Sequence, residues 1–202
     1  MGHLLAGAVR LFTGAQARWL GCAPEAERPR VYFANHVSHL DLVLIWSSLP
    51  PALRRRTRPA AAHDYWGAPP WRRRIAENVF NAVLIERHKI TRENNPVNQL
   101  ASVLDEGDSI IIFPEGTRNT DPVAPMREFK SGLHHLASRC PEVDLIPVYL
   151  ENLNRILPKG EFLPVPLLGS VTVGATIRLE CGETKASFLE RARSTVWNLH
   201  RA

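Results

Sequence analysis

The stretch that decides the fold is residues 35–41, which read Asn-His-Val-Ser-His-Leu-Asp. An apolar run at residues 31–34 precedes it and predicts a buried strand, and a second apolar run at residues 42–46 predicts the start of a helix. His36 is therefore placed at the carboxyl end of a strand, on the turn into a helix. In open α/β sheets this edge is where ligands bind.

The spacing in this stretch predicts that the side chains of His36 and Asp41 meet. The turn folds the first helical turn back over the strand end, so the carboxylate can hold one ring nitrogen and leave the other free to accept a proton. Ser38 and Asp41 also have the spacing of a capping box, in which the carboxylate closes back on the amino end of the helix. On spacing alone capping is the simpler interpretation, and the two oxygens of Asp41 could serve both purposes.

A second stretch, residues 113–119, reads Phe-Pro-Glu-Gly-Thr-Arg-Asn and again follows an apolar run that predicts a strand. Polar groups at a strand end can hold a phosphate: Gly116 permits close approach of the backbone, Thr117 offers a hydroxyl, and Arg118 can bind bidentately. The alternative is an ordinary strand-to-loop turn that carries a surface arginine.

Together these stretches resemble the glycerolipid acyltransferase family of the bacterial lysophosphatidate acyltransferase type. His36 and Asp41 fall on its His-x4-Asp block, and residues 113–118 fall on its Phe-Pro-Glu-Gly-Thr-Arg block. Residues 85–87 are similar to its Ile-x-Arg block, and residues 146–148 are similar to its late apolar-Pro block. The four blocks occur in the family's order and span most of the chain.

The resemblance implies an enzyme that moves a fatty acyl group from acyl-CoA or acyl-carrier protein to the free hydroxyl of a lysophosphatidate-like acceptor. It implies that His36 acts as general base and Asp41 orients it, with no metal and no cofactor besides the acyl donor. A backbone N–H in residues 35–38 or near Gly116 would then stabilise the oxyanion.

The resemblance also implies that residues 115–118 bind the acceptor headgroup, with Arg87 and Lys130 as supporting phosphate contacts. Glu115 would repel a phosphate, so we expect it to bond the acceptor's glycerol or to hold Arg118. The block around Arg87 departs from the family pattern, because Asn81 and Leu84 replace its usual glycine and aromatic residue.

Apolar periodicity predicts strands that alternate with helices, and hence an α/β fold with a mixed, mostly parallel central sheet flanked by helices. The expected helices are residues 4–20, 38–49, 71–78, 94–106, 129–139 and 184–200, and the expected strands are residues 31–34, 59–62, 81–85, 109–113, 145–150, 171–173 and 177–179. We expect an amphipathic helix and linker at residues 1–29 and an acyltransferase domain at residues 30–202.

Composition narrows the choice of partner and compartment. The 202 residues carry a net charge of +5, which favours an anionic partner such as a membrane surface, a nucleic acid or a phosphorylated substrate. Arginines cluster at residues 54–58 and 72–74, but no nucleic-acid-binding motif accompanies them. Three cysteines without a Cys-x-x-Cys pattern fit a reducing compartment and argue against a zinc site. We expect a cytoplasmic protein that touches the inner face of the membrane, with its amino-terminal helix either packed on the domain or lying at the lipid headgroups.

Two alternatives stay open at this point. The first is an acyltransferase that acts on another lysolipid or on an amino-acid-linked lipid. The second is a non-catalytic membrane-binding relative that keeps the fold, although the presence of both His36 and Asp41 argues against it.

Overall fold

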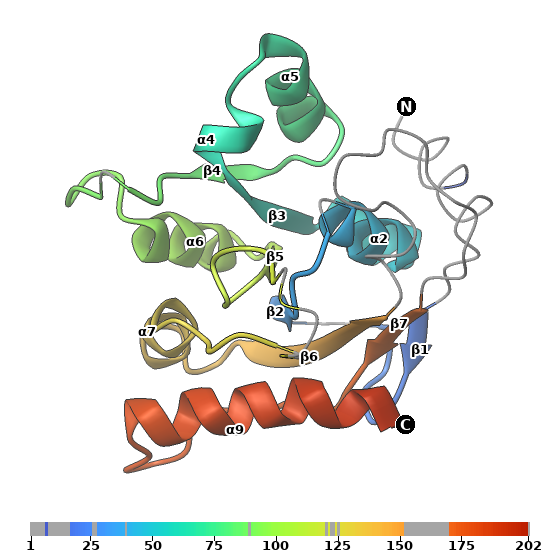
Figure 1. Ribbon diagram of the computed structural model, residues 1–202, viewed down its shortest axis with the longest axis vertical. Helices are drawn as coiled ribbons and strands as arrows, with labels where there is room; N and C mark the ends of the chain where they lie inside the picture. The colour runs from blue at the N-terminus through green and yellow to red at the C-terminus, as the bar shows by residue number, and fades with distance from the viewer. Residues whose placement is uncertain are drawn as a thin grey trace.

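A central sheet organises the computed structural model, which describes residues 7, 17–25, 28–38, 40–88, 90–119, 121, 124, 126–151 and 170–201. Its strand order is β1-β7-β6-β2-β5-β3-β4 (Figure 1). The strands are β1 (Ala17–Trp19), β2 (Arg30–Ala34), β3 (Thr57–Ala62), β4 (Val83–Ile85), β5 (Ser109–Ile112), β6 (Asp144–Glu151) and β7 (Ser170–Val173). The pairing of β6 with β7 is antiparallel and the other neighbouring pairs are parallel. The predicted mixed, mostly parallel sheet is confirmed.

Helices flank this sheet. They are α2 (Asp41–Ser48), α3 (Pro51–Arg55), α4 (His63–Trp66), α5 (Pro70–Asn78), α6 (Pro96–Asp105), α7 (Gly132–Arg139) and α9 (Lys185–Asn198), and α9 is followed by a 3₁₀ turn, η1 (Leu199–Arg201). Figure 1 shows α4 and α5 beside β3 and β4, and α9 running along β6.

The strand β2 is buried on both of its faces. Tyr32 and Ala34 join an apolar cluster that contains the buried side chains of α2, while Val31 and Phe33 join a second cluster with those of α6, α7 and α9. All four side chains are fully buried. A continuous apolar run is the pattern expected of a central parallel strand with helices on both faces, which is why residues 31–34 predicted it correctly.

The sheet order brings the two diagnostic stretches together. β2 and β5 are parallel neighbours in a register that pairs Val31 with Ile110 and Phe33 with Ile112. Their carboxyl ends therefore lie at the same edge of the sheet, and residues 35–41 and 113–119 leave that edge side by side. Strand pairing thus brings His36 and Glu115, which are 79 positions apart in the sequence, into contact.

Two predicted elements are wrong where the structure describes them. Ala17–Trp19, predicted as the end of a helix, forms β1, because pairing with β7 overrides local helical periodicity. The predicted strand at 177–179 reduces to a single antiparallel bridge between Leu145 and Ile177. The remainder of the predicted helix at 4–20, Gly7 apart, lies outside the described residues.

Two short helices lie outside the predicted helical ranges. Pro51 begins α3, because proline is well suited to the first helical position, where no N–H is needed. The segment directly after β3 forms α4. Both helices are five residues or shorter, and periodicity gives little signal over that length.

The described part of the chain also bears on three expectations, which concern membrane-spanning helices, metal sites and the cysteines. No helix there combines the length and the apolar character that are needed to cross a membrane. No group of three or more His, Cys, Asp or Glu side chains there is placed to hold a metal ion. Cys22, Cys140 and Cys181 are all free thiols.

Candidate functional site

His36 and Asp41 meet at the carboxyl end of β2. The Nδ1 atom of His36 lies 2.8 Å from Oδ2 of Asp41, as the spacing predicted. Asp41 is fully buried, whereas the His36 side chain is 20% exposed and lines a cavity. An imidazole whose Nδ1 is held by a carboxylate has Nε2 available, and Nε2 is the atom that can exchange a proton with a bound molecule.

A single oxygen of Asp41 performs both of the roles that the sequence allowed. Oδ2 accepts hydrogen bonds from the backbone N–H groups of Val37 (2.7 Å) and Ser38 (2.9 Å) as well as contacting His36. The expectation that each oxygen would serve one role is therefore wrong, and Oδ1 is buried with no partner among the described groups. Burial raises the pKa of Asp41, while the His36 ring and the two N–H donors act in the opposite direction.

The backbone and ring of His36 are fixed by the loop that follows β5. The imidazole stacks on Phe113, with ring centroids 4.3 Å apart and planes inclined by 20°. The N–H of His36 donates to Oε1 of Glu115 at 2.7 Å, and its carbonyl accepts from the N–H of Asn119 at 2.6 Å. The two diagnostic loops thus form one unit that determines where the imidazole points.

Glu115 has a different position from the one predicted. It is 1% exposed, does not line the cavity, and its second oxygen, Oε2, accepts from the N–H of Arg127 at 3.0 Å. Burial raises the pKa of Glu115, opposed by these two N–H donors. The predicted contact with acceptor glycerol or with Arg118 is corrected, because both carboxylate oxygens are already used to join segments of backbone.

Asn35 is a positioning residue that the sequence reasoning missed. Its amide Nδ2 donates to the carbonyl of Leu150 at 3.0 Å, and its Oδ1 accepts from the N–H of Leu150 at 2.8 Å. The side chain thereby binds the end of β6 and fixes the residue immediately before His36. A polar residue that directly follows an apolar strand was the available signal, but its partner is 115 positions away.

The cavity beside His36 has a volume of about 620 Å³. It brings together the other predicted substrate-binding residues, namely Arg87, Gly116, Thr117, Arg118 and Lys130. Apolar side chains from β3, α6 and α7, among them Ala61, Leu100 and Leu136, line it as well. A basic rim joined to an apolar wall suits an amphipathic molecule with an anionic head.

Arg87 links two parts of the cavity wall. Its Nη1 donates to the carbonyl of Gly116 at 3.0 Å, and its Nη2 lies 2.5 Å from Oδ2 of Asp64 on α4. This contact is the main reason why the pKa of Asp64 is lowered. Arg87 therefore shares its charge with a carboxylate, whereas Arg118 has no carboxylate partner among the described residues.

The backbone N–H groups expected to stabilise an oxyanion are largely occupied. Those of Val37 and Ser38 donate to Asp41, and that of His36 donates to Glu115. The N–H of Gly116 donates to the carbonyl of Phe113 at 3.0 Å. These four donors hold the loops in shape.

Gly116 is needed for its conformation and for the space above it. Its φ is +70°, in the left-handed region, and a Cβ built on it would lie 2.8 Å from Nζ and 2.9 Å from Cε of Lys130. The Lys130 side chain therefore packs directly over the glycine, and Lys130 and Arg118 line the same cavity.

Replacing Gly116 with alanine is expected to lower the free energy of unfolding by about 1–2 kcal/mol, because an L-residue is strained at this φ. The displaced Lys130 amine should also raise the KM for an anionic acceptor. Urea titration and initial-rate kinetics measure the two effects. Gly132→Ala is the control: its new Cβ meets no atom within 4 Å, so stability should be unchanged or higher. Equal stability of the two variants would contradict the role given to the Gly116 conformation.

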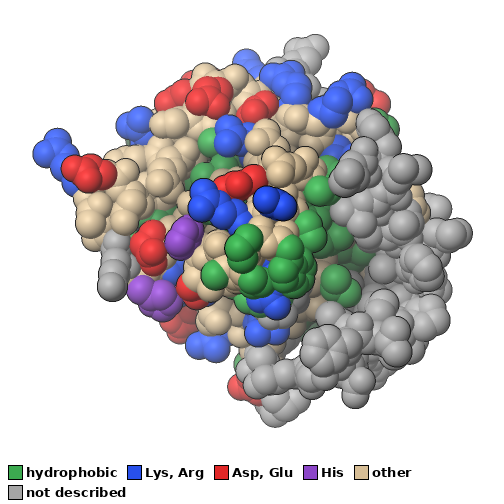
Figure 2. Space-filling view, turned by 90° about the horizontal axis from the view of Figure 1, so that it is seen from above, with side chains coloured by type: hydrophobic (Ala, Val, Ile, Leu, Met, Phe, Trp, Pro, Cys, Tyr) green, Lys and Arg blue, Asp and Glu red, His purple; other side chains and the backbone are tan. Residues whose placement is uncertain are grey.

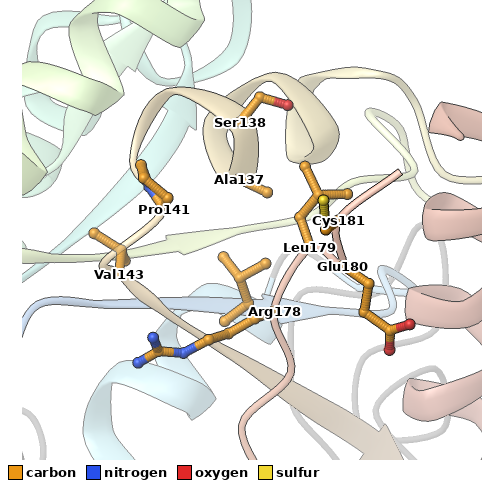
Figure 3. A pocket seen from close by; sticks show the side chains of 9 residues that line it. Ala137, Ser138, Pro141, Val143, Arg178, Leu179, Glu180 and Cys181 are labelled. Atoms are coloured by element: carbon orange, nitrogen blue, oxygen red, sulfur yellow. The ribbon is translucent and has the colours of Figure 1, made fainter. Parts of the chain in front are cut away.

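A second cavity, of about 300 Å³, lies between α7 and residues 178–181 (Figure 3). Figure 3 shows the Arg178 and Glu180 side chains extending in opposite directions from this segment. Arg178 is paired with Asp144 at 2.8 Å. None of the predicted site residues lines this cavity, whereas His36, Arg87, Gly116, Thr117, Arg118 and Lys130 line the larger one.

Comparison with known proteins finds relatives that carry the same name, 1-acyl-sn-glycerol-3-phosphate acyltransferase. The 1-acyl-sn-glycerol-3-phosphate acyltransferase of Haemophilus influenzae is 30% identical over 133 residues, which are 62% of this chain and 51% of the relative. The corresponding protein of Saccharomyces cerevisiae is 24% identical over 151 residues, 74% of this chain and 47% of the relative. The chain thus spans about half the length of these curated relatives.

The fold has a close structural counterpart. A crystal structure of the 1-acyl-sn-glycerophosphate acyltransferase from Thermotoga maritima superposes with a TM-score of 0.74 at 17% identity, covering 98% of this chain and 77% of that one. In sequence, the family model described as Acyltransferase matches residues 21–151, which contain the paired His36 and Asp41 and the rim of the larger cavity. Because that match covers well over half of the chain, the protein belongs to the acyltransferase family.

Proposed function

We propose that this protein transfers a fatty acyl group from a thioester, acyl-CoA or acyl-carrier protein, to the free hydroxyl of a lysophosphatidate-like acceptor. The observation that carries the proposal is that the His36–Asp41 pair opens on the same cavity as Arg87, Arg118 and Lys130. A proton acceptor and an anion-binding rim on one cavity fit an alcohol that carries a phosphate.

The reaction uses His36 first as a base and then as an acid. The acceptor hydroxyl attacks the thioester carbonyl carbon while its proton moves to Nε2 of His36. The buried carboxylate of Asp41 stabilises the imidazolium that forms. The carbon–sulfur bond then breaks, and the departing thiolate takes the proton from Nε2. The products are an ester and a free thiol, no acyl-enzyme is formed, and no cofactor besides the donor is required.

The acceptor's phosphate is held by the rim of the cavity. Arg118 can bind two phosphate oxygens at once, and Lys130 adds a point charge beside Gly116. Arg87 keeps the loop in place through the Gly116 carbonyl and contributes charge that Asp64 partly neutralises. The acyl chains of both substrates are apolar, which fits the aliphatic side of the same cavity.

The protein would act at the inner face of the membrane as a peripheral protein, since its acceptor is a lipid. The expected boundary at residue 30 is moved toward the amino terminus in this proposal, because β1 (Ala17–Trp19) pairs with β7 and so belongs to the acyltransferase domain.

Mass spectrometry of the lipid products tests the function. Purified protein is incubated with acyl-CoA or acyl-carrier protein and a mixture of lysolipids with different headgroups. We expect a diacyl product from the lysophosphatidate-like acceptor with stoichiometric release of thiol. Release of thiol without any new ester would contradict acyl transfer, and acylation of a different lysolipid alone would change the acceptor.

Replacing Arg118 with glutamine is expected to raise the acceptor KM by about 10- to 100-fold with little change in kcat, because a charge-assisted hydrogen bond to phosphate contributes about 1.5–3 kcal/mol to binding. Steady-state kinetics with varied acceptor measures the change. Arg92→Gln, which alters an exposed arginine outside the cavity lining, is the control. An unchanged KM in the Arg118 variant would remove that residue from the phosphate site.

A further inference from the structure

Two large hydrophobic side chains are exposed on the described surface, and one of them lines the cavity. Trp71 is 58% exposed and Ile90 is 55% exposed. Ile90 lines the cavity, and Trp71 follows the exposed residues Ala68, Pro69 and Pro70. The face that carries α4 and α5 is turned toward the viewer in Figure 2, which shows hydrophobic side chains at its centre bordered by Lys and Arg side chains.

Three arginines, residues 72–74, follow Trp71 directly in the sequence. The Arg72 guanidinium lies 4.5 Å from the ring centroid of Tyr65, which lines the cavity, and 5.2 Å from that of Trp71. Arg73 is paired with Glu77 at 2.8 Å, and Arg74 is exposed. The first turn of α5 contains no acidic residue. Cations near the amino end of a helix oppose its dipole, so the stability of α5 does not explain this placement.

The other arginine run, residues 54–56, contains side chains that make structural contacts. Arg54 is 7% exposed, and its guanidinium lies 5.2 Å from the ring centroid of Trp46. The Nη2 atom of Arg56 donates to the carbonyl of Gly107 at 2.8 Å. Two members of that run thus hold elements together. On α5, Arg72 makes a comparable contact with Tyr65 of α4, whereas Arg73 and Arg74 are exposed.

We propose that residues 68–74, the tip and first turn of α5, form the face that docks on an anionic lipid bilayer. Trp71 enters the headgroup region, where an amphipathic ring is stable, and Arg73 and Arg74 bind lipid phosphates. Docking in this orientation turns the cavity mouth, marked by Tyr65 and Ile90, toward the lipid. The inference rests on the proposed function only in supposing that the acceptor enters from that bilayer.

Flotation with lipid vesicles tests this surface on the full chain. Wild-type protein should bind vesicles that contain phosphatidylglycerol and should bind pure phosphatidylcholine much more weakly. Arg73→Gln/Arg74→Gln should lower the partition coefficient on the anionic vesicles by about 10- to 30-fold at low salt. The matched control is Arg55→Gln/Arg139→Gln, which removes one ion-paired and one other exposed arginine from the ends of α3 and α7, away from the cavity. That control should bind like the wild type.

Insertion of Trp71 is measured separately by quenching with brominated lipids. Tryptophan fluorescence of the wild type should be quenched on anionic vesicles, and Trp71→Phe should lose most of that quenching while retaining its fold. Equal vesicle binding of both double variants, or unchanged quenching in Trp71→Phe, would overturn the proposed docking face.

The two proposals fail in different ways. Wild-type protein that binds vesicles but transfers no acyl group would contradict the function and leave the docking face intact. Active protein whose double variant binds vesicles normally would contradict the docking face alone. Turnover of a short-chain, water-soluble acceptor should be unchanged in Arg73→Gln/Arg74→Gln, because that acceptor does not arrive through the bilayer.

Discussion

Replacing His36 with alanine is expected to lower kcat/KM for acyl transfer by about 10²- to 10⁴-fold, the usual contribution of a positioned general base. A neutral alcohol attacks a thioester slowly unless its proton is accepted during the attack. In this protein Asp41 and Phe113 hold the imidazole ring. The backbone of His36 is held by hydrogen bonds to the Glu115 side chain and to the N–H of Asn119. The ring can therefore accept that proton without rearrangement. Initial rates measured with saturating donor and varied acceptor give this kcat/KM.

His135→Ala is a matched control for this loss. His135 also lines the cavity, but its side chain has no carboxylate contact among the described residues. Its activity should stay within about threefold of the wild type. The melting temperature of His36→Ala should remain near that of the wild type, because the carboxylate keeps its two backbone donors at Val37 and Ser38. A His36 variant with nearly normal turnover would eliminate the base assignment.

Asp41→Asn is expected to lower kcat by about 10²-fold or more while changing the acceptor KM little. Oδ2 of the aspartate accepts from three N–H groups and Oδ1 has no partner, so the asparagine oxygen should take the Oδ2 position. The ring should therefore keep its orientation and lose only the negative charge that stabilises the imidazolium. The amide NH₂ then occupies the unpartnered position, which should cost about 1–3 kcal/mol of stability.

The double variant provides the sharper test. If His36 and Asp41 act as a unit, His36→Ala/Asp41→Asn should be no slower than His36→Ala alone, because the charge has nothing left to stabilise. Asp105→Asn, which alters a partly exposed carboxylate at the end of α6, should leave kcat unchanged. Multiplicative losses in the double variant would show that the carboxylate acts independently of the imidazole.

Local and non-local information contributed differently to the site. The contact between His36 and Asp41 could be predicted, because both residues lie within one strand-to-helix turn and spacing determines whether they meet. The family resemblance correctly identified the membership of the chain. Its substrate-binding residues, with the exception of Glu115, line one cavity, and their role in binding stays a prediction. A buried glutamate with two backbone partners has no local signature, since its neighbours in sequence read as a surface loop.

Secondary structure shows the same division. The buried strands β2 and β5 were predicted because an apolar run long enough for a strand, ended by polar turn residues, fits a central position in a parallel sheet. β1 was missed because three residues with ambiguous periodicity become a strand only when β7 lies beside them. The two arginine runs could not be told apart in sequence, and only the tertiary structure shows that Arg54 is buried while Arg73 and Arg74 are exposed.

The amino-acid sequence by itself determined the buried strands β2 and β5, the His36–Asp41 pair and the family, because each of these depends on residues that are close along the chain or on a fixed motif. The tertiary structure alone decided that Glu115 and Asn35 fix the backbone around the imidazole, that Lys130 packs over Gly116, and that the α5 arginines stay at the surface. The physical reason is that a hydrogen bond or a packing contact requires two groups within a few ångströms, and here only strand pairing and helix packing bring those groups together.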